Sequence, residues 1–170
     1  MYCEPEDAVD QIKDGLWIGG IRALVDSNVM KDMDAVVSIV ERDRIHEEIF
    51  PLSIGARPCL RVCVADGDVE LIQHLRRIAR FISEHRADHN ILIHCMAGRS
   101  RSVIALAYYM VTRMGYPTLD IALAKIQTRR PSALPKPELL IATKNYLKET
   151  WFVTTPPRIP KVPRPHRLNE

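Results

Sequence analysis

ILIHCMAGRSRSV, residues 91–103, is the most informative stretch of this chain. Its first four residues, Ile91–His94, form a short apolar run that predicts a buried strand. The segment then passes through a loop into VIALAYYMV, residues 103–111, which is apolar on nearly every side and predicts a central, buried helix. A strand, a loop and a buried helix in this order indicate a layered α/β fold.

Short apolar runs alternate with helical patterns on both sides of this segment. Strands are predicted at Ala35–Val40 and Leu60–Val64, and a strand or small hairpin at Ile12–Gly20. Helices are predicted from Val69 with apolar positions Ile72, Leu75, Ala79 and Ile82, from a Thr118 cap through Ile126, and from Pro137 through Leu147. This alternation predicts a central, mostly parallel sheet flanked by helices.

The loop between the strand and the buried helix has the composition of a phosphate-binding site. Backbone N–H groups of such a loop and the positive end of the helix dipole both attract anions. Gly98 has no side chain that would block a phosphate from the loop backbone, and Arg101 offers a bidentate guanidinium group. We therefore expect the whole loop to bind phosphate, through Met96, Ala97, Gly98, Arg99, Ser100 and Arg101.

Cys95 stands at the start of this loop, where the same positive environment stabilises a thiolate. A thiolate is a good nucleophile at neutral pH, so attack on a bound phosphate would give a phosphocysteine intermediate without a metal or cofactor. Ser102 is expected to donate a hydrogen bond to the departing thiolate when water attacks that intermediate. His94 is interpreted as a residue that orders the loop.

A proton donor for the leaving group should lie on a separate loop that approaches the phosphate from the side. VCVADGD, residues 62–68, follows a predicted strand and supplies two candidates. Asp66 is the preferred acid and Asp68 the reserve, while Gly67 would let the loop move. An Asp-Gly pair after a strand is also a common turn without any chemistry.

These residues resemble a known signature. HCMAGRSRS, residues 94–102, fits the H-C-x-x-G-x-x-R-S signature of the cysteine-based protein phosphatases, and the V-A-D that ends at Asp66 resembles their acid loop. Over about residues 10–148, including GLWIG, AVVSIV and RRPSALP, the chain is similar to the dual-specificity branch of the protein-tyrosine-phosphatase superfamily. The resemblance implies that fold, two-step hydrolysis without metal, and phosphotyrosine and phosphoserine or phosphothreonine substrates in proteins.

One segment departs from the family pattern. Many members read P-N-x-G-F where this chain has PKPEL at residues 135–139, so the asparagine that supports the phosphate loop is absent. The C-x-A-G-R-S-R-S wording also resembles mitochondrial-type phospholipid phosphatases of the same fold. Two alternatives therefore stay open: a phosphatase of a phospholipid such as a phosphoinositide or phosphatidylglycerophosphate, and a non-catalytic module that binds phosphoproteins.

Composition limits the other possibilities. With 46% hydrophobic and 26% charged residues the chain is typical of a globular domain, and its net charge of +3 is far from that of a nucleic-acid-binding module. No leader peptide or membrane-spanning run is evident, so we expect a cytoplasmic protein with access to the nucleus. Residues 1–150 are expected to form the catalytic domain and 151–170 a proline-rich, basic tail, which could bind a partner's aromatic groove.

The remaining candidates have ordinary interpretations. Cys59 and Cys63 share one face of a predicted strand and are expected to be packing residues, although a redox disulfide with Cys95 is conceivable. His85 and His89 are expected at the surface. Five arginines are interpreted mainly as solvated helix faces, with a minority interpretation as an edge that binds phosphosubstrate or lipid: Arg76, Arg77, Arg80, Arg129 and Arg130.

Overall fold

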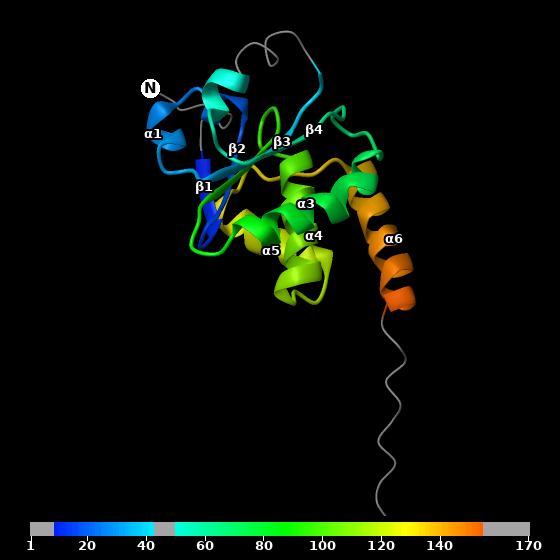
Figure 1. Cartoon of the computed structure of the whole chain (residues 1–170). Coiled ribbons are helices and arrows are strands. Elements are labelled where there is room, and N and C mark those ends of the chain that lie inside the picture. The colour runs from blue at the N-terminus through cyan, green and yellow to red at the C-terminus, as the bar shows by residue number, and fades with distance from the viewer. Residues whose placement is uncertain (1–8, 43–49, 155–170) are drawn as a thin grey trace, which may run out of the picture.

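The computed structural model describes residues 9–42 and 50–154, with side chains up to residue 150, and it contains a five-stranded sheet (Figure 1). The strands are β1 (Val9–Lys13), β2 (Leu16–Gly19), β3 (Ala35–Ile39), β4 (Cys59–Val62) and β5 (Ile91–His94). Their order across the sheet is β1-β2-β5-β3-β4. Only the β1–β2 pair is antiparallel, and it forms the hairpin that the sequence predicts near the start of the chain. The three other pairs are parallel, so the prediction of a mostly parallel sheet is confirmed.

Helices follow the predicted alternation. They are η2 (Ile21–Leu24), α1 (Ser27–Met30), α3 (Leu71–His85), α4 (Arg101–Met114), α5 (Leu119–Arg129) and α6 (Pro137–Thr154), with a further helical segment at 50–54. The predicted cap of α5 is confirmed, because the Thr118 hydroxyl accepts a hydrogen bond of 3.2 Å from the amide of Ile121. The β5 strand has the predicted bounds.

Both faces of the sheet are buried. Successive side chains of a strand point to opposite faces, and β5 shows this plainly. Ile91 and Ile93 pack in a large apolar cluster with α3, α4, α5 and α6, while Leu92 packs in a smaller cluster with η2, α1 and the segment at 50–54. The helices α3, α4, α5 and α6 therefore cover the same face of the sheet. Burial on both faces explains why β3 and β5 consist largely of apolar residues.

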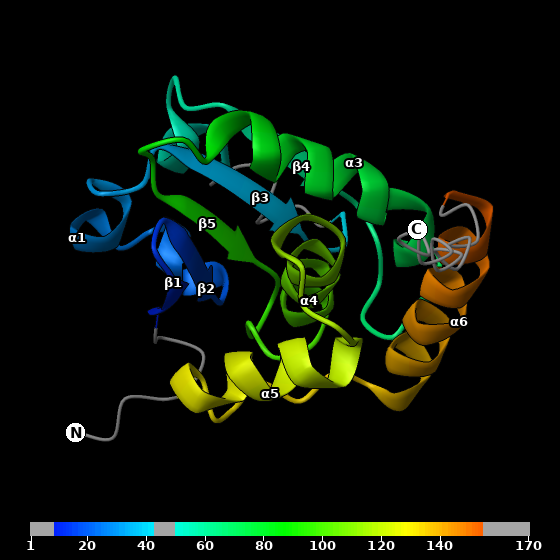
Figure 2. The same cartoon turned by 90° about the horizontal axis from the view of Figure 1, so that it is seen from below.

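Helix α4 occupies the centre of this layer, with α3 on one side and α5 on the other (Figure 2). Every side chain from Arg101 to Val111 is buried, which confirms the prediction of a central, buried helix. The helix begins seven residues after β5 ends, so the core fixes both ends of the connecting loop.

Several element ends differ from the predictions by a few residues; for example, β3 ends at Ile39 rather than Val40, and α3 begins at Leu71 rather than Val69. The strand expected at Leu60–Val64 is β4 and ends at Val62, because its last pairing with β3 is Ile39 with Val62. The helix expected to end at Leu147 continues to Thr154 and so includes the first residues of the expected tail. The rest of that tail, with its polyproline-like motifs, lies outside the described residues. Within the described residues, no helix combines the length and apolarity needed to cross a membrane.

Candidate active site

The phosphate loop, residues 95–101, lies at the carboxyl end of β5, where the edge of a parallel sheet commonly forms a binding site. A cavity of about 510 Å³ opens there. The loop forms most of its wall, and the other side chains come from segments far apart in the sequence. Its lining residues are Glu41, Asp66, Cys95, Met96, Ala97, Arg99, Ser100, Arg101, Leu134 and Lys136.

Groups outside the loop hold four consecutive loop carbonyls. The amide of Ile21 donates to Met96 O (2.9 Å), that of Leu134 to Arg99 O (2.8 Å), and the Arg130 side chain to Gly98 O (2.7 Å) and Ala97 O (3.2 Å). In a trans peptide the N–H points opposite to the preceding C=O, and the described chain has no cis peptide. The amides of residues 97–100 therefore face the other way, towards the cavity. None of these four amides donates to another described residue, so they are free to bind an anion.

Gly98 is required here for a reason that the sequence interpretation did not give. Its φ is +65°, a conformation that side chains with a Cβ rarely adopt. A Cβ at this position would lie 2.6 Å from the carbonyl oxygen of Gly19 and 2.7 Å from Nη2 of Arg130. The loop backbone thus packs directly against β2 and against Arg130, and a larger residue would displace it.

Arg130 corrects the prediction of a solvated helix face. Its side chain is 1% exposed, whereas that of the neighbouring Arg129 is exposed as predicted. Besides the two loop carbonyls, Arg130 contacts Asp10, with 2.7 Å between Nη1 and Oδ2. A planar guanidinium with several fixed donors suits such a junction. Arg130 therefore ties the phosphate loop to β1, a role that no local pattern around α5 indicates.

Cys95 and Ser102 lie together at the floor of the cavity. The Cys95 side chain is 3% exposed, and its Sγ is 3.3 Å from the Oγ of Ser102, which is fully buried on α4. The hydroxyl can therefore donate to a thiolate at this position. His94 is also fully buried, and its Nδ1 lies 3.2 Å from the carbonyl oxygen of Cys95. Ser102 and His94 therefore both contact Cys95, one through its sulfur and the other through its carbonyl oxygen.

Arg101 connects the phosphate loop to the acid loop, residues 64–68. Its side chain is 4% exposed, and its Nη1 donates to the carbonyl of Val64 over 2.7 Å. Its Nε lies 3.8 Å from Oδ1 of Asp66, so the predicted acid and the predicted phosphate-binding arginine lie beside each other in the cavity wall. The two loops that the sequence interpretation combined are therefore adjacent in space.

Asp68, the reserve candidate for the acid, makes its contact outside the cavity. Its side chain accepts a hydrogen bond of 2.8 Å from the amide of Glu70, just before α3, and it does not line the cavity. This is the local bonding expected of an aspartate at the start of a helix. The geometry therefore favours Asp66 over Asp68.

The segment at residues 135–139, whose sequence differs from the family pattern, still contacts the phosphate loop. The backbone amide of Lys136 donates to Oγ of Ser100 over 3.0 Å. This backbone amide and the Arg130 side chain both hold the phosphate loop, although the asparagine that the resemblance implies is absent. The ammonium group of Lys136 turns to the acid loop and lies 3.1 Å from Oδ2 of Asp66.

The two other described cysteines differ from each other. Cys59 packs against the smaller apolar cluster as expected, and burial raises the pKa of its thiol to about 12, although nearby Arg61 acts in the opposite direction. Cys63 is exposed, so its expected packing role is wrong, because β4 ends one residue earlier. A thiol with a raised pKa forms little thiolate, so Cys59 is a poor partner for thiol exchange at neutral pH.

Comparison with known families matches residues 20–147 to the dual specificity phosphatase catalytic domain. The chain is 30% identical over 128 residues to dual specificity protein phosphatase 1 of Arabidopsis thaliana, a match that covers 73% of this chain and 61% of that protein. It is 38% identical over 95 residues to dual specificity protein phosphatase 22-B of Danio rerio, covering 54% of this chain and 50% of the relative.

Solved structures agree on the fold. The crystal structure of human DUSP28 superposes with a TM-score of 0.73 at 21% identity, covering 84% of this chain and 95% of that one. The crystal structure of DUSP15 superposes with a TM-score of 0.71 at 26% identity, covering 81% of this chain and 86% of that one.

The chain spans 61% and 50% of the lengths of the two curated relatives described above.

Proposed function

Because this chain belongs to the dual-specificity phosphatase family, we propose that it hydrolyses phosphomonoesters through a phosphocysteine intermediate, without a metal ion. One observation carries the proposal. Cys95 Sγ lies in a cavity that it shares with the Arg101 guanidinium and the Asp66 carboxyl, beneath loop amides that face inward. A nucleophile, an anion site and a proton donor thus meet at one place, as nucleophilic phosphoryl transfer requires.

The first step phosphorylates the enzyme. The loop amides and Arg101 hold the phosphate in line with Cys95, whose thiolate forms a bond to phosphorus while the bond to the ester oxygen breaks. Asp66 gives its proton to that departing oxygen. Because charge accumulates on the phosphoryl oxygens in the transition state, the fixed amides and guanidinium contribute most there.

The second step restores the enzyme. Water attacks the phosphorus of the phosphocysteine and gives a proton to the Asp66 carboxylate, while the bond between sulfur and phosphorus breaks. Ser102 then donates a hydrogen bond to the leaving thiolate. Inorganic phosphate and the free thiolate are the products.

The proposed substrates are phosphotyrosine and phosphoserine or phosphothreonine in proteins. Met96 and Leu134 line the cavity with 41% and 65% of their side chains exposed, so they offer apolar contacts beside the phosphate site. Such contacts suit the ring of phosphotyrosine.

A substrate panel in EDTA tests this proposal. We expect turnover of p-nitrophenyl phosphate and of phosphotyrosine and phosphothreonine peptides, measured as released phosphate. Phosphoinositide and phosphatidylglycerophosphate vesicles should react more slowly. Turnover of the lipids alone would replace the protein-phosphatase proposal with the phospholipid alternative. Absence of all turnover would leave the non-catalytic binding module.

Ser102→Ala should slow the second step selectively. Loss of a hydrogen bond to a charged sulfur should reduce kcat roughly 10- to 100-fold, while the first step keeps its rate. Rapid-quench measurements with p-nitrophenyl phosphate should then show a burst of p-nitrophenol equal to the enzyme concentration. A variant that slows the burst and the steady state equally would contradict this role.

A further inference from the structure

Lys136 touches both loops that carry the proposed chemistry. Its backbone amide donates to Ser100 Oγ in the phosphate loop over 3.0 Å, and its ammonium group lies 3.1 Å from Oδ2 of Asp66 in the acid loop. One residue, placed directly before α6, therefore fixes a side chain of the acid loop relative to the phosphate loop.

Gly67 gives the stem of Lys136 its place. A Cβ on Gly67 would lie 3.0 Å from Cδ of Lys136 and 3.6 Å from its Nζ, and the φ of Gly67 is +86°. The lysine side chain thus runs along the acid loop at a residue without a side chain. Besides the loop movement that the sequence predicts for it, Gly67 thus leaves room for the Lys136 side chain.

The Asp66 carboxyl faces a different cation on each oxygen. Oδ2 meets Lys136 at 3.1 Å, and Oδ1 meets Nε of Arg101 at 3.8 Å. The Arg101 side chain is buried and bonded to Val64, whereas Lys136 is half exposed. Arg101 will turn to the substrate phosphate when one binds, because its donors match phosphate oxygens. Lys136 is then the contact that stays with the acid.

We propose that Lys136 is a positioning residue: its ammonium group donates to Oδ2 of Asp66 and holds the carboxyl over the phosphate loop, so that the proton on Oδ1 reaches the leaving oxygen. The proposal rests on the proposed function, in which Asp66 is the general acid. Its physical basis is the distance dependence of proton transfer, which requires the donor within hydrogen-bond reach of the leaving oxygen. An ion pair between half-exposed side chains adds little to folding stability, so its removal tests position rather than folding.

The leaving group of the substrate provides the readout. A p-nitrophenolate departs readily without a proton, whereas a phenolate resembling tyrosine, with a pKa near 10, depends on the acid. The quantity to compare is kcat/KM for p-nitrophenyl phosphate and phenyl phosphate, because it includes only the steps up to phosphocysteine formation. We expect Lys136→Met to lower kcat/KM about tenfold for phenyl phosphate and less than about twofold for p-nitrophenyl phosphate.

Two further variants show whether Lys136 acts through Asp66. In an Asp66→Asn background, Lys136→Met should cause no additional loss, because the group that it positions is already gone. Lys136→Arg keeps a cation on a long stem and should recover most of the phenyl phosphate activity.

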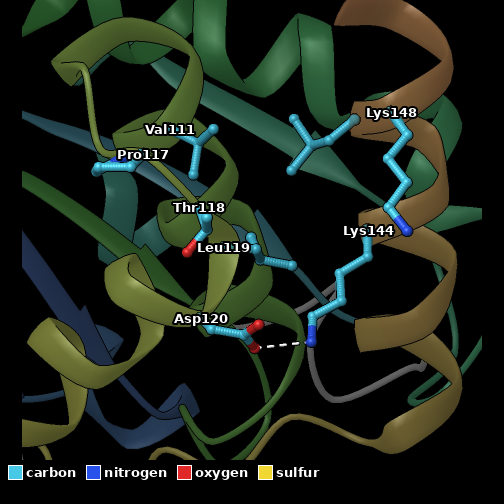
Figure 3. A pocket seen from close by; sticks show the side chains of 8 residues that line it. Val111, Pro117, Thr118, Leu119, Asp120, Lys144 and Lys148 are labelled. Atoms are coloured by element: carbon cyan, nitrogen blue, oxygen red, sulfur yellow. Dashed lines mark ion pairs between the residues drawn. The ribbon is translucent and has the colours of Figure 1, made fainter.

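A second lysine of the same region provides the matched control. Lys144 reaches from α6 to Asp120 on α5 (Figure 3). The distance between its Nζ and Oδ1 of Asp120 is 2.7 Å. Lys144→Met removes an equivalent lysine–aspartate pair outside the active site. Both of its kcat/KM values should remain unchanged.

The outcomes separate this proposal from the proposed function. Equal losses of kcat/KM on both substrates would show that Lys136 binds the substrate phosphate. Losses that add to those of Asp66→Asn would show that Lys136 acts independently of Asp66. Either result overturns the proposal. If Asp66→Asn lowers phenyl phosphate turnover selectively and Lys136→Met does not, only the role of Lys136 fails. If Asp66→Asn itself shows no dependence on the leaving group, the acid assignment in the proposed function fails instead.

Discussion

Replacing Cys95 with serine is expected to abolish turnover, with a loss of kcat/KM on the order of 10⁴-fold or more. A serine hydroxyl is a far weaker acid than a thiol, and its neutral oxygen is a poor nucleophile towards phosphorus at neutral pH. The side chain is nearly the same size, and Ser102 lies close enough to bond it. The fold and the phosphate site should therefore stay intact, so the loss isolates the nucleophile.

Two measurements complete this test. Phosphotyrosine peptides should still bind to Cys95→Ser, as isothermal titration calorimetry would show, because the loop amides and Arg101 remain. Cys63→Ser is the matched control, since Cys63 is the exposed cysteine of the described chain, and it should keep full activity. Retention of even a tenth of the activity in Cys95→Ser would exclude a phosphocysteine intermediate at this residue.

The centre of the site could be predicted because its residues are consecutive. The apolar run Ile91–His94, the glycine and the arginine all lie within a dozen residues, and the buried helix begins where they end. Residues that are neighbours along the chain are therefore also neighbours in the folded site. The inward direction of the loop amides, in contrast, depends on donors far along the chain, namely Ile21, Arg130 and Leu134.

The supporting residues could not be predicted, because they act over long distances in the sequence. Arg130 bonds to a carbonyl 32 residues earlier and to a carboxylate 120 residues earlier. Next to Arg129 at the end of a helix it has the local pattern of a solvated cation. In the sequence, Lys136 only marks a position where an asparagine is absent. The folded chain shows that its backbone amide donates to Ser100 and that its ammonium group lies beside the Asp66 carboxyl.

Arg130→Met should therefore damage both stability and activity. The substitution leaves the carbonyls of Ala97 and Gly98 and the Asp10 carboxylate without their guanidinium donor. Unmet hydrogen bonds of this kind should lower the free energy of unfolding by about 2–4 kcal/mol, allowing for the partial exposure of Asp10. Differential scanning fluorimetry should record a Tm lower by roughly 4–16 °C.

Activity should fall even where the variant is fully folded. If the loop carbonyls turn back without Arg130, the amides of residues 97–100 no longer converge on the phosphate, and a shift of about 1 Å costs roughly 100-fold in rate. Assays well below the Tm of the variant separate this loss from unfolding. Arg129→Met, one residue away and exposed, should change neither quantity. If the Arg130→Met variant is stable but inactive, Arg130 fixes the position of the loop without contributing to stability. If the variant is active but destabilised, the hydrogen bonds from Ile21 and Leu134 are enough to keep the shape of the loop.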